Sequence, residues 1–286
     1  MLGAAAQEGP LAHPLMALRT LALPEGGPHV KTAVSARLTS SVRDISVYSV
    51  ETSATVSGFM ESIAARTDGL LYVTRTMGAI SAHSPDLAAV VRESPETYAD
   101  TAAGERVVPV AALPLTGLSA SSSWLAGFTR LALTVGLRLL DLGVALEAHG
   151  QNLLVVLSPT GEPLRLVYRD LADIRVSPAR LARHNIKAPE LSGRIVTDDE
   201  MALCRKLFGS LVAGALASVA GSATVLRTAL QAAAQDLPPT PDLPALYEGS
   251  YPTKALTLMR LSPQRTGDLW ARLPSPFIER AATCDS

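Results

Sequence analysis

Two short apolar runs separated by a polar turn lie near the middle of the chain. Residues 153–157 form the first run, and residues 164–168 form the second. The intervening residues 158–163 are rich in proline, glycine, serine and threonine, which favour turns. Each run has the length of a strand, so the pattern predicts a β-hairpin.

Polar side chains gather at the open end of this predicted hairpin. Glu147, His149 and Asn152 precede the first strand, and Arg169 and Asp170 follow the second. In an antiparallel pair the start of one strand lies beside the end of the next, so these residues are expected to converge. Carboxylate and amide oxygens suit Mg²⁺, and cationic donors suit phosphates. A single histidine before a strand is more often a cap or a surface group. The prediction of a site for magnesium and phosphate therefore depends on the whole set of residues.

A second candidate region lies near the start of the chain. Residues 30–38 alternate apolar and polar side chains, which predicts a half-buried strand that carries Lys31. Thr39 is a predicted helix N-cap, which would place Arg43 one turn later on the same face. Together with Arg19 these groups could hold a phosphate, although an isolated lysine or arginine is more often a solvated surface charge.

Longer periodic segments follow. Apolar residues at helical spacing predict one helix over 124–146, and one or two helices over 198–235 with Thr197 as N-cap. Residues 207–226 carry no charge and are long enough to span a membrane. Few aromatic residues of the kind that anchor a helix at a bilayer interface flank them, so a buried helix is expected instead. Residues 254–261 are predicted to form a strand. The fold class is therefore α+β.

Composition narrows the function classes. The chain has 286 residues, 48% of them hydrophobic, and a formal net charge of −1. This balance excludes a broad footprint for nucleic acid or for an anionic membrane. The two cysteines, Cys204 and Cys284, exclude a disulfide framework and a cysteine-rich metal site. The first residues lack the basic region of a signal peptide, so a cytoplasmic location is expected.

The sequence E-A-H-G-Q-N at 147–152, the hairpin and the R-D pair at 169–170 resemble the signature of a known family. These are the NRPS-independent siderophore synthetases of the aerobactin-synthetase (IucA/IucC-like) family. The resemblance continues in A-L-R-T at 17–20, in Lys31, in the T-x-x-x-R segment at 39–43 and in 254–261. It covers most of residues 13–277, including the family's FhuF-like C-terminal region.

The sequence also departs from the family pattern. Ala17 stands where the family usually has serine, which removes one hydroxyl contact to the phosphates. The strand over 70–76, which often ends in glutamate in the family, ends here in Thr74-Arg75-Thr76. The spacing from Lys254 to Arg260 is one residue longer than in the family.

The resemblance implies an ATP-dependent ligase that adenylates a carboxylic acid, often citrate, after which an amine or alcohol displaces AMP. It implies a fingers-like β lobe over 1–118, a palm-like helical lobe with the hairpin over 119–277, and a tail over 278–286. ATP and Mg²⁺ are the implied cofactors.

The resemblance also assigns roles to residues of this sequence. Lys31, Arg43 and His149 would be catalytic, Glu147 and Asp170 would hold Mg²⁺ with help from Asn152, and Lys254 and Arg260 would bind the substrate carboxylates. The implied nucleotide-binding residues are Arg19, Thr20, Lys31, Thr39, Ser40, Arg43, His149, Asn152 and Asp170.

Length leaves alternatives open. Family members are considerably longer, and the HPxxK-type motif of their N-terminal region is not found at His13-Pro14, since no lysine follows at the right distance. The chain is therefore expected to be the C-terminal part of such an enzyme, with little or no turnover of its own. The alternatives are a nucleotide-binding pseudoenzyme, one piece of a split synthetase, and a kinase-like phosphotransferase, which lacks support because H-R-D-L-x-x-x-N and D-F-G are absent.

The expected partners follow from this reading. They are a small carboxylic acid and an amine or alcohol, with a second copy of the chain or a separate N-terminal chain as possible protein partners. Neither nucleic acid nor a membrane is expected as a partner.

Overall fold

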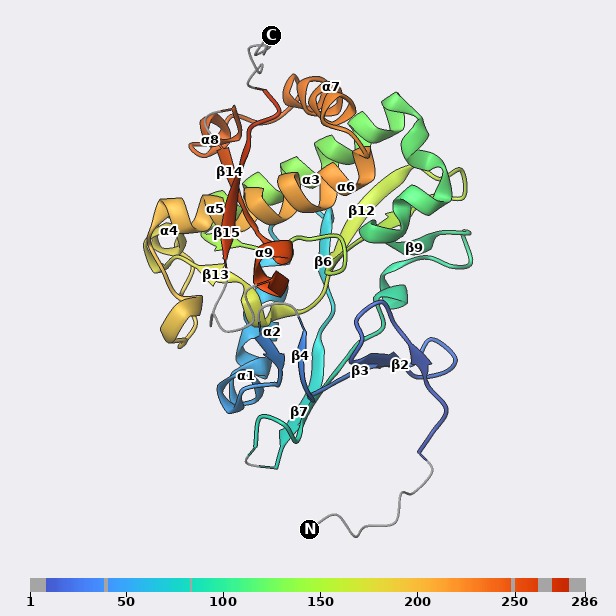
Figure 1. Ribbon diagram of the computed structural model, residues 1–286, viewed down its shortest axis with the longest axis vertical. Helices are drawn as coiled ribbons and strands as arrows, with labels where there is room; N and C mark the ends of the chain where they lie inside the picture. Colours follow the sequence, from blue (N-terminus) through green and yellow to red (C-terminus); the bar gives the residue numbers. More distant parts are fainter. Residues whose placement is uncertain (1–8, 39–40, 83, 248–249, 262–268, 278–286) are drawn as a thin grey trace.

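Helices and strands segregate into two lobes, which confirms the predicted α+β class (Figure 1). The computed structural model describes residues 9–38, 41–82, 84–247, 250–261 and 269–277. The β-rich lobe lies at one end of the molecule and the helical lobe at the other.

The β lobe is built on a five-stranded antiparallel sheet with the order β1-β2-β3-β8-β7. Two helices, α1 (Val47–Glu51) and α2 (Ser53–Ala64), pack against β7, and α1 also contacts β8. A separate hairpin of β4 and β5 adjoins them. The strands are β1 (His13–Pro14), β2 (Thr20–Ala22), β3 (His29–Thr32), β4 (Val34–Leu38), β5 (Ser41–Arg43), β7 (Thr76–Ser81) and β8 (Ala88–Arg92).

The predicted hairpin forms the centre of a four-stranded sheet with the order β6-β12-β11-β9. Its register pairs Leu153 with Tyr168, as the antiparallel arrangement requires. The strands are β6 (Leu71–Val73), β9 (Arg106–Pro109), β11 (Leu153–Leu157) and β12 (Pro163–Tyr168), and β6 runs parallel to β12. Because β6 and β9 come from before residue 119, this sheet joins the two predicted lobes.

Both faces of the hairpin are buried, which explains its nearly continuous apolar sequence. One face packs into the main core beneath α3 (Ser122–Leu142), where Tyr168 and Phe128 are fully buried. The opposite face forms a small cluster of Leu154, Val156 and Val167, against which Tyr98 packs. The hairpin is therefore held from two sides, and the turn at its open end has a rigid base.

Helix α3 ends four residues earlier than predicted. Gly143 has a φ of 102°, in the left-handed region that favours glycine, and caps the helix after Leu142. The next two residues form β10 (Val144–Ala145), which pairs with β13 (Arg175–Val176). The chain thereby enters the E-A-H-G-Q-N turn in extended conformation.

A long helical stretch crosses the helical lobe. It comprises α5 (Glu200–Ser210), a π-helical segment (Leu211–Leu216) and α6 (Ala217–Ala220). Asp199, rather than the predicted Thr197, caps α5, because its side chain accepts from the backbone N–H of Met201. Within the described residues this stretch, Glu200–Ala220, is the one helix long and apolar enough to cross a membrane by length and composition. Its apolar residues Leu207, Leu211 and Leu216 pack into the main core.

Shorter elements complete the lobe. The α-helices are α4 (Pro178–Arg183), α7 (Ala223–Ala234), α8 (Leu243–Tyr247) and α9 (Leu256–Leu261), and the last two strands are β14 (Ser250–Lys254) and β15 (Trp270–Pro274). The 3₁₀ helices are Pro95–Tyr98, Val110–Thr116, Leu118–Ala120, Leu171–Asp173 and Gly193–Ile195.

Three sequence predictions of local structure are wrong. Residues 30–38 form two strands, since Ala33 donates its N–H to Ala88 and the chain then leaves the sheet to pair with β5. Arg43 ends a strand instead of following a helix N-cap, and α1 begins later with Ser46 as its cap. Residues 256–261 form helix α9, in keeping with their content of leucine, methionine and arginine, which are good helix formers.

Candidate functional site

The site is centred on the carboxylate of Asp170, directly after β12. Asp170 has a φ of 72°, a left-handed conformation that aspartate tolerates better than most residues. Its two carboxylate oxygens accept from Lys31 Nζ at 2.7 and 2.6 Å. Arg92 Nη2 lies 3.6 Å from Oδ1. Residues from β3, β8 and the end of the hairpin therefore meet at one point between the lobes.

Positive charge exceeds negative charge around this carboxylate. Burial opposes the charge of Asp170, but Lys31, Arg92 and Arg19 outweigh it and hold the pKa of the carboxyl well below its usual range. Burial lowers the pKa of Lys31, assisted by Arg92 and opposed by Asp170. Three cations thus face one anion, an arrangement suited to a further anionic ligand.

A cavity of about 470 Å³ opens beside this cluster. Arg19 donates from Nη1 to the backbone oxygens of Arg43 and Asp44, the latter at 2.7 Å, which fixes the segment after β5 against the cavity. Thr20 is buried and lies opposite Lys31 in the pairing of β2 with β3. It therefore helps to hold the strand that carries the lysine. The cavity wall is formed by Arg19, Lys31, Arg43, Arg92, Asp170 and residues of α1, α2, 171–173 and 192–195.

The E-A-H-G-Q-N turn is anchored from several sides. Ala148 donates its N–H to Ser210 Oγ at 2.9 Å, and Ala111 donates its N–H to the Gly150 oxygen at 2.9 Å. Arg169 donates its backbone N–H to the Asn152 oxygen at 3.0 Å and its Nε–H to the Gln151 oxygen at 3.0 Å. The backbone of Gln151 and Asn152 therefore meets Arg169 as predicted, whereas the Glu147 carboxylate pairs with lysines instead. Asn152 itself is buried.

The surroundings of His149 shift its imidazole toward the neutral form. Burial lowers the pKa of its imidazole, and the attraction of Glu147 and Asp170 does not reverse the shift. Nδ1 accepts from the Gln151 backbone N–H at 3.3 Å, which leaves the proton on Nε2. The residue can therefore donate a hydrogen bond to an anion, but it brings no positive charge in this state.

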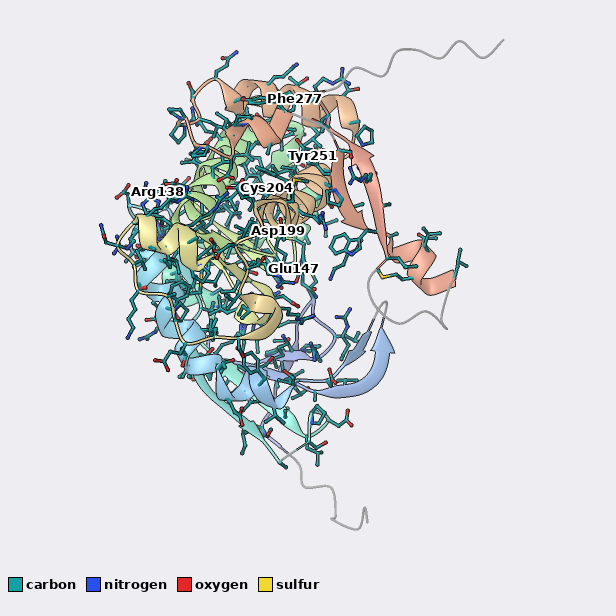
Figure 2. The ribbon with its side chains drawn as sticks, turned by 90° about the vertical axis from the view of Figure 1, so that its left-hand side faces the viewer. Arg138, Glu147, Asp199, Cys204, Tyr251 and Phe277 are labelled. Atoms are coloured by element: carbon teal, nitrogen blue, oxygen red, sulfur yellow. The ribbon has the colours of Figure 1, made fainter. Side chains whose placement is uncertain are left out.

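Glu147 lies between two lysines. Lys206 Nζ is 3.1 Å and Lys254 Nζ is 3.2 Å from its Oε1. Burial disfavours the charged carboxylate, but Lys206 and Lys254 outweigh it and lower the pKa of Glu147. Figure 2 places Glu147 on the side of the helical lobe that faces the β lobe.

The structure does not gather a ready-made metal site. Glu147 and Asp170 each have lysine partners, and within the described residues no group of three or more His, Cys, Asp or Glu side chains converges. The magnesium role of the two carboxylates stays a prediction.

The remaining predicted residues have different outcomes. Lys254, expected at the substrate carboxylates, lies at the end of β14 against Glu147. Arg260 lies on α9, and its side chain is outside the described part. Thr39 and Ser40 lie outside the described residues.

Four residues of this region carried no assigned role in the sequence prediction. Arg92 ends an apolar strand, and Arg169 was expected nearby without a binding role. Lys206 follows the buried Leu203 by three residues, so helical periodicity could have placed it on the inner face of α5. His29 lies in β3 with its Nδ1 buried and without a partner among the described residues.

Comparison with known proteins identifies the fold and the family. The IucA / IucC family profile matches residues 2–114, and the profile of the ferric iron reductase FhuF-like transporter family matches residues 122–269. The FhuF-like profile covers more than half of the chain, so the chain belongs to that family, and residues 2–114 match the IucA / IucC family. No curated protein matches the chain.

Three solved structures share the fold of this chain at low sequence identity. The petrobactin biosynthesis protein AsbB from Bacillus anthracis str. Sterne is 18% identical with a TM-score of 0.78, over 93% of this chain and 53% of AsbB. ATP-bound aerobactin synthetase IucA from a hypervirulent pathotype of Klebsiella pneumoniae is 18% identical with a TM-score of 0.68, over 94% of this chain and 55% of IucA. Aerobactin synthetase IucC from the same source is 18% identical with a TM-score of 0.64, over 94% of this chain and 54% of IucC. The chain thus spans about half the length of these relatives.

Proposed function

We propose that this chain is the nucleotide-binding part of an ATP-dependent ligase of siderophore biosynthesis. The ligase adenylates a carboxylic acid, citrate or a related di- or tricarboxylate, and condenses it with an amine or alcohol. The observation that carries the proposal is the excess of cations, Arg19, Lys31 and Arg92, around Asp170 in the cavity between the lobes.

The cation cluster suits the charge of a nucleotide. A triphosphate carries several negative charges, whereas Asp170 supplies one, so the cluster can take up phosphate oxygens with a net gain in attraction. Lys31 is the best placed, because its ammonium is nearly enclosed and, within the described part of the chain, Asp170 is the one carboxylate that pairs with it. His149, with its proton on Nε2, is suited to donate to a phosphate or a carboxylate oxygen.

Adenylation requires positioning more than a covalent enzyme nucleophile. A substrate carboxylate oxygen bonds to the α-phosphorus, the bond to the β-phosphate bridging oxygen breaks, and pyrophosphate leaves. An amine or hydroxyl then attacks the acyl carbon, loses its proton and displaces AMP. The cations stabilise charge that builds up on the phosphates during the first step. Lys254, beside Glu147, is the described candidate for holding the acid.

Glu147 and Asp170 are the candidate ligands for magnesium. When bound, it would supply charge neutralisation at the phosphates. Lysine side chains neutralise both carboxylates, so these residues do not fit a preformed metal site.

The relatives support this choice of function. AsbB acts in petrobactin biosynthesis, IucA and IucC are aerobactin synthetases, and one IucA structure is ATP-bound. A cytoplasmic location fits a protein that would use ATP. A second candidate is a nucleotide-binding protein without turnover, or one piece of a split synthetase; the chain covers 53–55% of the relatives' length.

Calorimetric titration with ATP, with and without Mg²⁺, tests the nucleotide site. Lys31→Ala and Arg92→Ala should each weaken binding about tenfold or more, because each removes a charge-assisted contact worth about 1.5–3 kcal/mol. Arg43→Ala and His149→Ala should weaken it as well. Arg66→Ala is the matched control, since Arg66 is exposed at the end of α2 and outside the cavity. Unchanged binding in all four site variants would show that the site is placed wrongly.

A further inference from the structure

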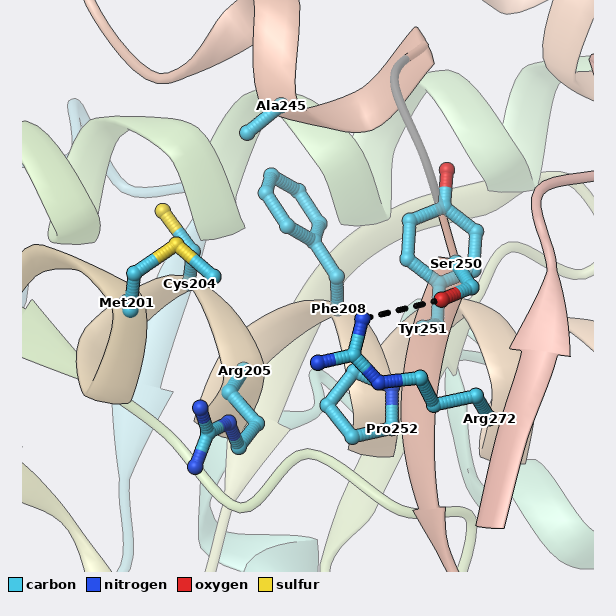
Figure 3. Close-up of a pocket in the computed structure, with 9 residues that line it drawn as sticks. All are labelled: Met201, Cys204, Arg205, Phe208, Ala245, Ser250, Tyr251, Pro252 and Arg272. Carbon is cyan, nitrogen blue, oxygen red and sulfur yellow. Dashed lines mark hydrogen bonds between the residues drawn. The ribbon is translucent and has the colours of Figure 1, made fainter.

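A second cavity lies in the helical lobe, between α5 and the β14–β15 hairpin. Its volume is about 260 Å³, slightly below the range of about 300–1,000 Å³ typical of pockets for drug-sized ligands, so it suits a smaller molecule. Its wall includes Met201, Cys204, Arg205, Phe208, Tyr251 and Arg272 (Figure 3). None of these residues belongs to the proposed nucleotide cavity.

The floor of this cavity is apolar and fixed. Phe208 and Tyr251 are almost fully buried, and their ring centroids are 6.1 Å apart. The Tyr251 hydroxyl donates to the Leu246 oxygen, so the polar end of this ring is already satisfied. Burial, assisted by Asp242, raises the pKa of the Cys204 thiol to about 12, which keeps it protonated. A flat apolar group is therefore the natural occupant of the floor.

Among the described residues that line the rim, two are positively charged and none is negatively charged. Arg205 and Arg272 are both exposed, and Figure 3 shows their guanidinium groups on the same side of the Phe208 ring. Arg272 makes one weak contact, from Nη1 to Ser250 Oγ at 3.5 Å. In the described part of the chain no carboxylate forms an ion pair with either arginine. Guanidinium groups recognise carboxylates through paired N–H donors.

We propose that this cavity is a binding site for a small organic carboxylate with a flat, apolar body. The carboxylate lies between Arg205 and Arg272, and the apolar body lies over Phe208 and beside Tyr251. Two rim cations with an apolar floor select against neutral ligands and against small, fully hydrated anions alike.

This cavity is distinct from the proposed nucleotide cavity, but it is lined by the same two elements that carry the lysine partners of Glu147. Arg205 and Lys206 are neighbours on α5, and Arg205 lines this cavity while Lys206 pairs with Glu147. On the hairpin, Tyr251 lines the cavity and Lys254, three residues further along β14, pairs with Glu147. The cavity thus lies on the outer side of the two elements that hold both lysines.

Titration of the intact chain with sodium benzoate tests the proposal, with ligand-observed NMR and calorimetry as readouts. Benzoate supplies a carboxylate on a flat apolar ring, and benzamide is the neutral control of the same shape. Arg205→Ala and Arg272→Ala should each weaken benzoate binding about tenfold, in line with the loss of a charge-assisted hydrogen bond. Arg183→Ala, on the exposed face of α4, should leave binding unchanged.

A competition arm separates this site from the proposed nucleotide site. Saturating ATP should not displace benzoate, and Lys31→Ala should not weaken it. The proposal is overturned if benzoate does not bind, if benzamide binds equally well, if the Arg205→Ala/Arg272→Ala double variant retains full affinity, or if ATP displaces benzoate. ATP binding is measured separately, so failure of this proposal leaves the proposed function untouched.

Discussion

Asp170 is the residue on which the cation cluster depends. Its carboxylate pairs with Lys31 and lies 3.6 Å from Arg92, and these cations stabilise its negative charge. A bound nucleotide would have to share these cations with the carboxylate. Two roles are therefore distinguishable by experiment: Asp170 either orients cations alone, or it also holds magnesium.

We expect Asp170→Asn to separate the effects of nucleotide charge and of metal. Loss of the negative charge should strengthen binding of metal-free ATP, because repulsion of the triphosphate disappears. If Asp170 is a metal ligand, its loss should weaken binding of Mg²⁺–ATP. The affinity for Mg²⁺–ATP divided by the affinity for metal-free ATP should then fall about tenfold. Calorimetry in EDTA and in Mg²⁺ measures that ratio.

Asp173→Asn is the matched control for this experiment. Asp173 lines the same cavity, but it pairs with Arg194 at 3.0 Å and not with the cation cluster. Its ratio should stay at the wild-type value. An unchanged ratio in Asp170→Asn would remove Asp170 from the predicted magnesium ligands.

His29 should make the stability of the β lobe depend on pH. Burial, together with Arg169 and Arg92, lowers the pKa of His29 from 6.5 to about 4. As the pH falls below about 6.5, the unfolded chain takes up a proton that the folded chain refuses until about pH 4. The free energy of unfolding should therefore decrease as the pH is lowered from about 6.5 to about 4. Above about pH 6.5, His29 should make no pH-dependent contribution to stability.

Replacement by leucine removes this contribution. We expect the loss of stability between pH 7 and pH 5, measured by denaturant unfolding, to be smaller in His29→Leu than in the wild type. His13→Gln, which changes an exposed histidine on β1, should keep the wild-type pH dependence. An identical pH dependence in His29→Leu would show that His29 titrates normally in the folded protein.

At the scale of elements, α5 and β14 approach each other closely at Gly209, where the helix has no side chain. A Cβ at Gly209 would lie 2.2 Å from the backbone oxygen of Pro252. The same two elements carry Lys206 and Lys254, so their separation sets how both lysines meet Glu147.

Gly209→Ala should therefore destabilise the protein by about 1–3 kcal/mol, the usual cost of overpacking a core. Gly58→Ala on α2 is the control, because a Cβ there meets nothing within 4 Å. That change should stabilise the protein by about 0.5–1 kcal/mol through helix propensity. Thermal unfolding of both variants gives the comparison, and equal shifts in the same direction would contradict the close packing.

Local patterns predicted the elements that depend on neighbours in sequence. The hairpin was predictable because its strands, turn and pairing are contiguous, and its register brought residues 147–152 to 169–170 as expected. The predicted strand over 254–261 failed because an alternating reading could not exclude a short helix of leucine, methionine and arginine. The single strand over 30–38 failed because its break depends on Ala88, far along the chain.

The same limit applies to the site. Arg19 and Lys31 were predicted from their own segments, whereas Arg92 reaches the site only because β8 pairs with β3. Strand pairing across about sixty residues leaves no local signal in one sequence. The lysine partners of Glu147 were likewise hidden, since Lys206 and Lys254 meet it through the packing of α5 and β14.

At the scale of the whole molecule, the two lobes meet at the proposed nucleotide cavity, and the chain spans about half the length of its solved relatives. We expect the isolated chain to bind nucleotide but to show little or no ligase turnover. Adenylation needs the acid in line with the α-phosphorus, and a misplacement of about 1 Å can cost about 10²-fold in rate. Ala17, where the family usually has serine, removes one further hydroxyl from the phosphate side.

Solvent access gives the second reason for low turnover. If a further part of the enzyme closes over the nucleotide, its absence leaves water around the phosphates and weakens every charge interaction in the cavity. A pyrophosphate-release or hydroxamate assay with citrate and related di- and tricarboxylic acids measures turnover, run on the chain alone and with an N-terminal partner chain. Robust turnover by the chain alone would contradict the prediction. Rescue by the partner would establish a split ligase, and inactivity under both conditions, with ATP binding intact, would favour the nucleotide-binding protein without turnover.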